Sequence, residues 1–295
     1  MVNVDKYYNP LAEVFGFPIT NNGSQAKRYR SKQLCPYNNK VPNCTKDKAK
    51  NPLGVCSINH NNAPIITCPV RFRQDWIIIE NAANFFFSKS DQWTSLSEIK
   101  LLDKNGQTAG NVDYVLVSYN KNGEIIDFGS LEVQGVYISG NLRNPFEKYK
   151  ENPKANFSWT PGYNYPKPDY LSSSRKRLVP QMLYKGGIFK KWEKKQAVVL
   201  QKQFWDTLPV LPVVPEEKAD IAWFIYDLEY NNKLKIFDVV LIEKVFTEFL
   251  PALDKIIIPT PGKVENFISL LQEKLDVKLD NPPDAPALNE IINNE

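Results

Sequence analysis

The sequence contains no run of 18 apolar residues, so it predicts no transmembrane helix. Its first residues, MVNVDKYYNPLAEV, lack the basic and then apolar order of a secretory signal. Internal repeats and low-complexity blocks are also missing. We therefore expect a cytoplasmic protein. Because the cytosol keeps thiols reduced, disulfide bonds are the weaker explanation for its cysteines.

Basic residues outnumber acidic residues by only a small margin. The net charge of +4 is too small by itself to indicate a polyanionic partner, but its distribution is uneven. Residues 27–50 and residues 175–195 each contain eight basic residues and one acid, whereas residues 273–295 contain six acids and two lysines. This polarity suits a protein with one phosphate-binding face. Ordinary solvated surface charge is the alternative, and charge alone favours it.

The length and the order of the segments limit the fold. The 295 residues suffice for one large domain or two modest ones, and 42% of them are hydrophobic. The mixed order of apolar segments predicts an α/β fold. We expect a loop-rich region over residues 1–72 and a core over residues 73–295, with an irregular insertion at about 144–174.

Several segments have a predicted secondary structure. We expect a short helix around residues 10–15 and a longer helix over residues 191–205, with Gly186 and Gly187 turning the chain before it. The apolar run IAWFIYDLEY predicts a buried strand over residues 221–230. A helix is expected over residues 261–275, with Pro261 near its start.

Acidic residues stand inside an apolar hairpin over residues 111–139. This stretch reads as two strands joined by a polar turn that contains Asn-Gly. Side chains two apart on a strand face the same way, so Glu132 and Gln134 share a face. If the hairpin closes, Asp113 on the first strand approaches that face. Two converging carboxylates form a site for a hard divalent cation such as Mg²⁺, and Glu98 lies upstream as a further acid.

Each of these residues also has an ordinary structural explanation. Asp113 could cap a turn at the end of a strand, and Glu132 could form a partly buried salt bridge. Gln134 could simply hydrogen-bond on the face of a sheet. Their joint occurrence beside a cysteine cluster favours a metal-dependent phosphodiesterase site.

All four cysteines lie within one short segment: Cys35, Cys44, Cys56 and Cys68. Four thiolates suffice for a tetrahedral structural site that holds zinc or iron. Metal binding would supply folding energy to a loop-rich segment that has little core of its own. The alternative is a set of free buried cysteines, which the clustering disfavours.

These motifs together resemble the NotI-like type II restriction endonucleases. The likeness rests on LCPYNNKVPNCTKDKAKNPLGVCSI, TCPVRF, the acid-x18-E-x-Q arrangement and PQMLYKGGIFKKWEKKQAVVLQKQFWDTLP, and spans roughly residues 27–210. The resemblance implies a PD-(D/E)xK nuclease core: a mixed central sheet flanked by helices. It also implies Mg²⁺-dependent cleavage of both strands of palindromic DNA, a homodimer and a cognate DNA methyltransferase in the same system.

The resemblance also assigns roles to residues. Cys35, Cys44, Cys56 and Cys68 match the iron ligands, although the thiolates themselves do not separate iron from zinc. Asp113 matches the metal-binding aspartate, and Glu132 with Gln134 matches an E-x-Q form of the E-x-K motif. Glu98 matches an additional acid. Because an amide is neutral, Gln134 cannot supply the positive charge of the usual lysine.

Basic residues are candidates for DNA contacts. We expect phosphate contacts from the basic runs, and base contacts from the two arginines that closely follow the last cysteine. Ordinary surface solvation is the alternative for each. The candidates are Lys27, Arg28, Arg30, Arg71, Arg73, Arg175, Lys176 and Arg177. A repair or methylation-directed nuclease, and a non-catalytic DNA-binding protein stabilised by a four-cysteine metal site, remain alternative functions.

Overall fold

The structure is a computed structural model and divides into two compact units, Met1–Ile257 and Ile258–Glu295. No helix among the described residues combines the length and apolar character needed to cross a membrane. The described residues are 9–38, 42–48, 50–153 and 164–280.

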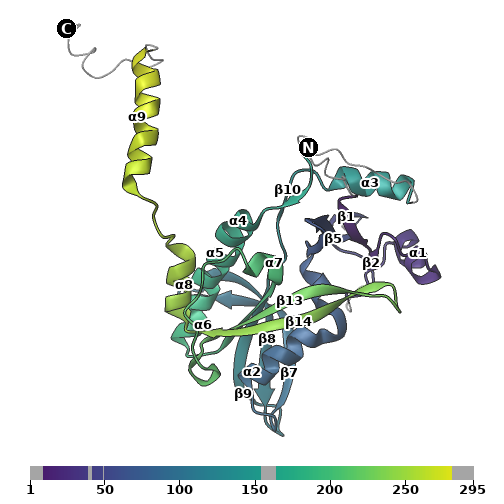
Figure 1. The fold of residues 1–295 in the computed structure, drawn as a ribbon. Helices are drawn as coiled ribbons and strands as arrows, with labels where there is room; N and C mark the ends of the chain where they lie inside the picture. Colours follow the sequence, from purple (N-terminus) through teal and green to yellow (C-terminus); the bar gives the residue numbers. More distant parts are fainter. Residues whose placement is uncertain (1–8, 39–41, 49, 154–163, 281–295) are drawn as a thin grey trace. The chain divides into compact units, whose positions relative to one another are not determined.

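A six-stranded mixed sheet forms the centre of the first unit (Figure 1). Its strand order is β14-β13-β12-β9-β8-β7. The central strand β12 runs parallel to both β9 and β13, and the other neighbours are antiparallel. The strands are β7 (Gln92–Leu102), β8 (Thr108–Tyr119), β9 (Ile125–Val133), β12 (Gln196–Gln201), β13 (Ile221–Asn231) and β14 (Ile236–Thr247). The expected α/β class, a mixed central sheet flanked by helices, is confirmed.

Smaller sheets lie outside the central sheet. Four short strands near the N-terminus form a sheet of order β2-β1-β5-β6, and two two-stranded ribbons pair β3 with β4 and β10 with β11. Their bounds are β1 (Leu11–Val14), β2 (Phe17–Pro18), β3 (Asp47–Lys48), β4 (Asn51–Pro52), β5 (Val55–His60), β6 (Ala63–Ile66), β10 (Ile138–Ser139) and β11 (Lys167–Pro168).

The helical segments connect these strands. An almost continuous helical stretch runs from Tyr170 to Lys191 and includes two π-helical turns, η2 and η3. The segments are α1 (Ser24–Ser31), η1 (Pro69–Trp76), α2 (Ile77–Phe86), α3 (Arg143–Glu151), α4 (Tyr170–Ser173), η2 (Ser174–Leu178), α5 (Val179–Gln181), η3 (Met182–Gly186), α6 (Gly187–Lys191), α7 (Lys202–Trp205), η4 (Glu216–Lys218), α8 (Phe249–Ile257) and α9 (Val264–Asp280).

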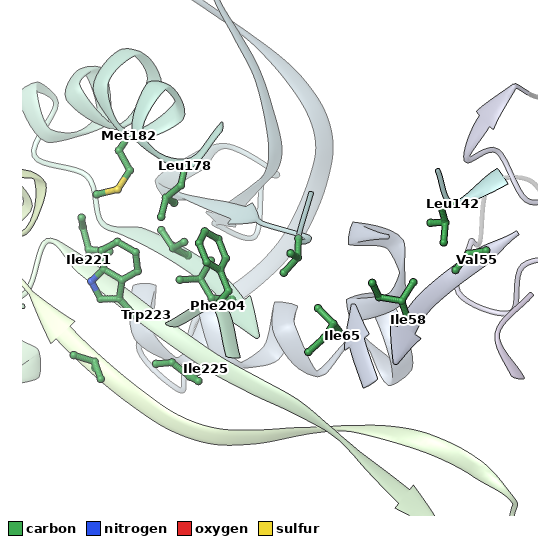
Figure 2. Close-up of a cluster of buried hydrophobic side chains, with 14 of the residues drawn as sticks. Val55, Ile58, Ile65, Leu142, Leu178, Met182, Phe204, Ile221, Trp223 and Ile225 are labelled. Carbon is green, nitrogen blue, oxygen red and sulfur yellow. The ribbon is translucent and has the colours of Figure 1, made fainter. Parts of the chain in front are cut away.

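Helices cover both faces of the central sheet. On one face the apolar side of α2 packs against alternate residues of β8, β9, β12 and β13, such as Leu131 and Phe224. On the other face Leu178 and Met182 pack toward Trp223 (Figure 2). Because β12 and β13 are buried on both sides, they read as continuous apolar runs rather than alternating ones.

The expectation of a helix over residues 191–205 is wrong for most of its length. The helix ends at Lys191, and Gln196–Gln201 forms the fully buried strand β12. A short apolar run cannot be assigned to helix or strand by periodicity alone, and here tertiary burial selects the strand. Gly186 does not turn the chain either. It lies inside the helical stretch, where a Cβ would meet the Gln196 side chain at 2.7 Å and Phe249 at 2.8 Å.

Other expectations have mixed outcomes. The hairpin of residues 111–139 forms as β8 and β9, and the buried strand over residues 221–230 forms as β13. The helix expected over residues 261–275 forms as α9, whose described side chains are all exposed. The short helix expected over residues 10–15 is instead strand β1. The segment expected to be irregular begins with α3, and its residues 154–163 lie outside the described residues.

A buried ion pair joins the N-terminal sheet to the central sheet. Glu13 of β1 lies 3.0 Å from Arg71 of η1, and both side chains are fully buried. Arg71 also donates a hydrogen bond of 2.7 Å to the carbonyl of Phe237 in β14. Its guanidinium lies 4.5 Å from the centre of the Tyr37 ring. These contacts hold η1 and the N-terminal strands against the edge strand β14. The expected division at residue 72 stays a prediction.

The buried pair leads to a stability prediction. Replacing Arg71 with Met leaves the Glu13 carboxylate buried without its cation, so we expect a loss of about 3–5 kcal/mol in the free energy of unfolding. Urea denaturation followed by circular dichroism measures it. The control is the double variant Glu13→Gln/Arg71→Met, which buries no lone charge and should regain most of the loss. A loss below about 1 kcal/mol for Arg71→Met would contradict the prediction.

Candidate active site

The pairing of β8 with β9 brings Asp113 and Glu132 together. Tyr114 pairs with Leu131, so the residues that flank this pair, Asp113 and Glu132, are opposed across the two strands. Asp113 Oδ2 accepts a hydrogen bond of 2.8 Å from the backbone N–H of Val133. The two carboxylates lie close enough that Asp113 helps to raise the pKa of Glu132. The geometry expected of the hairpin is therefore present.

Glu132 is held by a lysine that the sequence analysis did not select. Lys185 Nζ lies 2.6 Å from Glu132 Oε2, and the two side chains are only 8% and 12% exposed. The pKa of Glu132 is raised to about 8, mainly by burial and also by Asp113, whereas Lys185 acts to lower it. Glu132 Oε1 is buried and has no hydrogen-bond partner. One carboxylate oxygen of Glu132 is therefore committed to Lys185, and the other receives no hydrogen bond from an N–H or O–H donor.

Glu98 approaches the pair from the neighbouring strand. Ser97 pairs with Tyr114 and Ile99 with Val112, so Glu98 stands opposite Asp113 on β7. Its backbone is left-handed, with a φ of 57°, although it lies inside a strand. Such a conformation is uncommon for a residue other than glycine and is often found at functional sites.

A small hollow of about 50 Å³ opens beside these acids. It is lined by Pro69, Arg73, Glu98, Asp113, Tyr114 and Val133. The guanidinium of Arg73 lies 5.5 Å from the centre of the Tyr114 ring. Burial raises the pKa of Tyr114, Arg73 lowers it, and Asp113 and Glu98 raise it. Arg73, Asp113 and Glu98 therefore all lie close enough to Tyr114 to influence it. Two of these side chains are anionic and one is cationic.

Gln134 lies next to the acids but is turned toward its own backbone. It follows the end of β9 and is 3% exposed. Its backbone N–H donates to the carbonyl of Val199, and its side-chain amide donates to the carbonyl of Gly135 at 2.8 Å. The amide nitrogen is thus satisfied within the protein, and the charge beside Glu132 comes from Lys185.

Lys185 carried a signal that sequence reasoning could have used. It lies in MLYKGGIF, a stretch of apolar residues and glycines. A lysine is rarely buried unless an anion pairs with it, so a lysine inside an apolar segment predicts a buried acidic partner. The segment does not reveal which acid, because Glu132 lies 53 residues earlier.

The four cysteines have free thiols, and Cys35, Cys44 and Cys56 each lie close enough to Cys68 for its charge to act on them. The pKa of Cys35 is raised to about 11, mainly by burial and also by the neighbouring thiols of Cys68 and Cys44. The pKa of Cys56 is raised well above its usual value by burial and by the neighbouring Glu13, Cys68 and Cys35. Throughout the described ranges, however, no three His, Cys, Asp or Glu side chains are grouped so as to hold a metal ion.

The basic candidates fall into two groups. Arg71 is fully buried, and Arg30 is half-buried and donates to the carbonyls of Asn21 and Pro18, so neither guanidinium is presented to solvent as a free group. Arg73 is half-buried at the hollow. The exposed candidates are Lys27, Arg28, Arg175, Lys176 and Arg177.

Arg73 lines a second, larger groove of about 740 Å³ as well as the hollow. Its walls come from residues 16–37, from η1 and from the β13–β14 turn. That turn contributes Lys233 and Lys235. The groove therefore carries three cationic side chains, Arg73, Lys233 and Lys235, beside the acids Asp75 and Asp238.

Comparison with known proteins gives one family. A family model described as restriction endonuclease NotI matches residues 14–239. This match covers more than half of the chain and includes Glu98, Asp113, Glu132, Lys185 and all four cysteines. No curated protein sequence matches the chain.

Proposed function

Because this chain belongs to the restriction endonuclease NotI family, and is thereby a type II enzyme that cleaves DNA at specific sites, we propose that Asp113 and Glu132 are its catalytic carboxylates. The observation that carries the proposal is the approach of two carboxylates on paired strands, with one buried oxygen of Glu132 left without a partner. The mixed sheet, with its acids on β8 and β9, is consistent with a PD-(D/E)xK core.

The donor set suits Mg²⁺. Carboxylate oxygens are the ligands that this hard cation prefers. Burial, and after it the neighbouring Asp113, raises the pKa of Glu132, so a divalent cation would stabilise the ionised carboxylate, and Oε1 receives no hydrogen bond that would compete with it. Bound Mg²⁺ supplies neutralisation of the nonbridging phosphate oxygens and a more acidic water. Asp113 and Glu132 would hold it.

The neighbouring side chains have separate roles in this proposal. Glu98, exposed on β7, orients the attacking water from the open side of the hollow. Arg73 faces the same hollow and pairs with the scissile phosphate, because a guanidinium binds phosphate oxygens in a fork. Gln134 positions the end of β9 through its bond to the Gly135 carbonyl.

DNA binding is proposed for the groove and the exposed basic residues. Arg73 lines both the groove and the hollow, so DNA bases bound in the groove would lie near the cleaved phosphate. Arg175, Lys176 and Arg177 are exposed on the π-helical turn η2 and suit contacts to the phosphate backbone.

Cleavage of both strands requires two active sites or two turnovers. The described part of the chain contains one pair of opposed carboxylates on β8 and β9, so we propose a homodimer that presents one pair to each strand of a palindrome. A cognate DNA methyltransferase is proposed as the partner that protects host DNA.

A structural metal is proposed for the cysteines. Soft thiolates suit zinc or iron, and the four thiols already influence one another electrostatically. Burial raises the pKa values of the Cys35, Cys44 and Cys56 thiols, so metal binding would have to release their protons. The sulfur positions would also have to move together into a tetrahedron.

The first prediction concerns cleavage. Asp113→Asn and Glu132→Gln each remove one anionic ligand, so we expect loss of Mg²⁺-dependent cleavage of phage DNA by at least about 100-fold, with folding retained. Discrete bands on a gel measure the activity. Glu217→Gln removes an exposed acid away from the hollow and should cleave normally. Full activity of both site variants would refute the proposed site.

The second prediction concerns the cysteines. Inductively coupled plasma mass spectrometry of the purified chain should find about one iron or zinc per chain. Cys44→Ser should lower this content and the melting temperature, because one ligand is lost. A metal-free, fully folded wild-type chain whose four thiols are alkylated after unfolding would instead support free buried cysteines.

The third prediction concerns salt. Each phosphate contact contributes about 0.9 to the slope of log affinity against log salt concentration. Arg175→Ala should therefore reduce that slope by about one, measured by fluorescence anisotropy in Ca²⁺. Lys121→Ala, in the exposed turn between β8 and β9, should leave it unchanged. Equal slopes for both variants and the wild type would remove Arg175 from the DNA face.

A further inference from the structure

The neutral Gln134 leaves the motif without its usual cation, and the structure has a cation elsewhere. We infer that Lys185 replaces it as a positioning residue: from the helical layer it fixes Glu132 and supplies the positive charge of the site. This inference rests on the proposed function of Asp113 and Glu132. It adds a residue from outside the strand motif, delivered by the π-helical turn η3.

The contacts of Lys185 leave its ammonium group little freedom. Nζ donates a hydrogen bond of 2.6 Å to Glu132 Oε2 and one of 2.8 Å to the carbonyl of Asn111 on β8. One cation thus ties together the strands that carry Asp113 and Glu132. The stem of Lys185 passes over Gly110, where a Cβ would meet its Cδ at 3.6 Å. The side chain is 8% exposed, so water offers no competing site for the charge.

The turn that carries Lys185 is itself fixed to the sheet. Gln196 of β12 donates a hydrogen bond of 3.1 Å to the carbonyl of Gly186. Gly186 also packs so closely on the Gln196 side chain and on Phe249 that a Cβ there would clash. Single π-helical turns within α-helices frequently occur at functional sites, and this one places Lys185 against the sheet.

The contact with Lys185 sets the orientation of the Glu132 carboxylate. Lys185 takes Oε2, and Oε1 is left buried and without a partner beside Asp113. A carboxylate without this contact could turn both oxygens away from Asp113. Lys185 therefore selects the orientation in which Glu132 and Asp113 present oxygens to the same ligand.

The test is Lys185→Met, which keeps much of the apolar stem and removes the charge. We expect cleavage to fall about 10–100-fold and the Mg²⁺ concentration for half-maximal rate to rise, as is typical when a partner of a metal ligand is removed. The rise in melting temperature on adding Mg²⁺ should shrink as well, a readout that does not depend on activity. Binding of DNA without divalent metal should be retained.

Two further variants complete the test. Lys194→Met removes the half-buried ion pair with Asp127 on a lysine close in sequence and should keep the wild-type Mg²⁺ response. Lys185→Arg keeps the charge and should keep a measurable Mg²⁺-induced stabilisation. If Lys185→Met does not fold by circular dichroism, Lys185→Arg decides: a folded Arg variant with the Mg²⁺ response supports the inference, and one without it overturns it.

Two failures can be told apart. A folded Lys185→Met variant that cleaves within about threefold of wild type, with an unchanged Mg²⁺ requirement, overturns the role of Lys185 while leaving Asp113 and Glu132 in place. Full cleavage by both Asp113→Asn and Glu132→Gln, in the same assay, overturns the proposed site itself.

Discussion

The antiparallel register of β8 and β9 is the constraint on which the site depends. A shift of one residue would turn every side chain of one strand to the opposite face and separate Asp113 from Glu132. The register is held because Leu116 and Leu131 are buried under α2, whereas Val115 packs on the other face near Phe189. Burial of both faces thus fixes the positions of two costly acids.

Cations from other layers of the fold offset the free-energy cost of burying these acids. Lys185 reaches Glu132 from the helical layer, and Arg73 reaches the same region from η1. Asp113 receives a backbone N–H instead. A buried carboxylate without such partners would be strongly destabilising. The sheet supplies the acids, and the segments that pack on it supply the opposite charges.

Local sequence signals predicted the elements that are set by their own residues. The hairpin, its acids and the strand over residues 221–230 followed from alternation, apolar runs and the Asn-Gly turn, and the structure has them. Whether residues 196–201 form a strand or a helix depends on pairing with β9 and β13, which are distant in sequence. Periodicity alone therefore predicted the wrong element. The pairing of Lys185 with Glu132 could not be predicted for the same reason, because the two residues are far apart in the sequence.

Arg71 shows a different limit. Its position after the last cysteine suggested a solvent-facing base contact, but Glu13, 58 residues earlier, holds it in the interior. Sequence shows that an arginine and a glutamate are present and does not show that folding will bury them together. Among the candidate cations, burial separates Arg71 from the exposed Arg175, and only the folded chain reveals it.

The contact between Glu132 and Lys185 also bears on how such enzymes are found. Its two members are 53 positions apart, and one is on a strand while the other is on a helix. A sequence motif defined on neighbouring residues of one strand does not detect this arrangement. Spatial templates that require an acid pair and an ammonium group, from whatever element, would detect diverged nucleases whose linear signature has been lost.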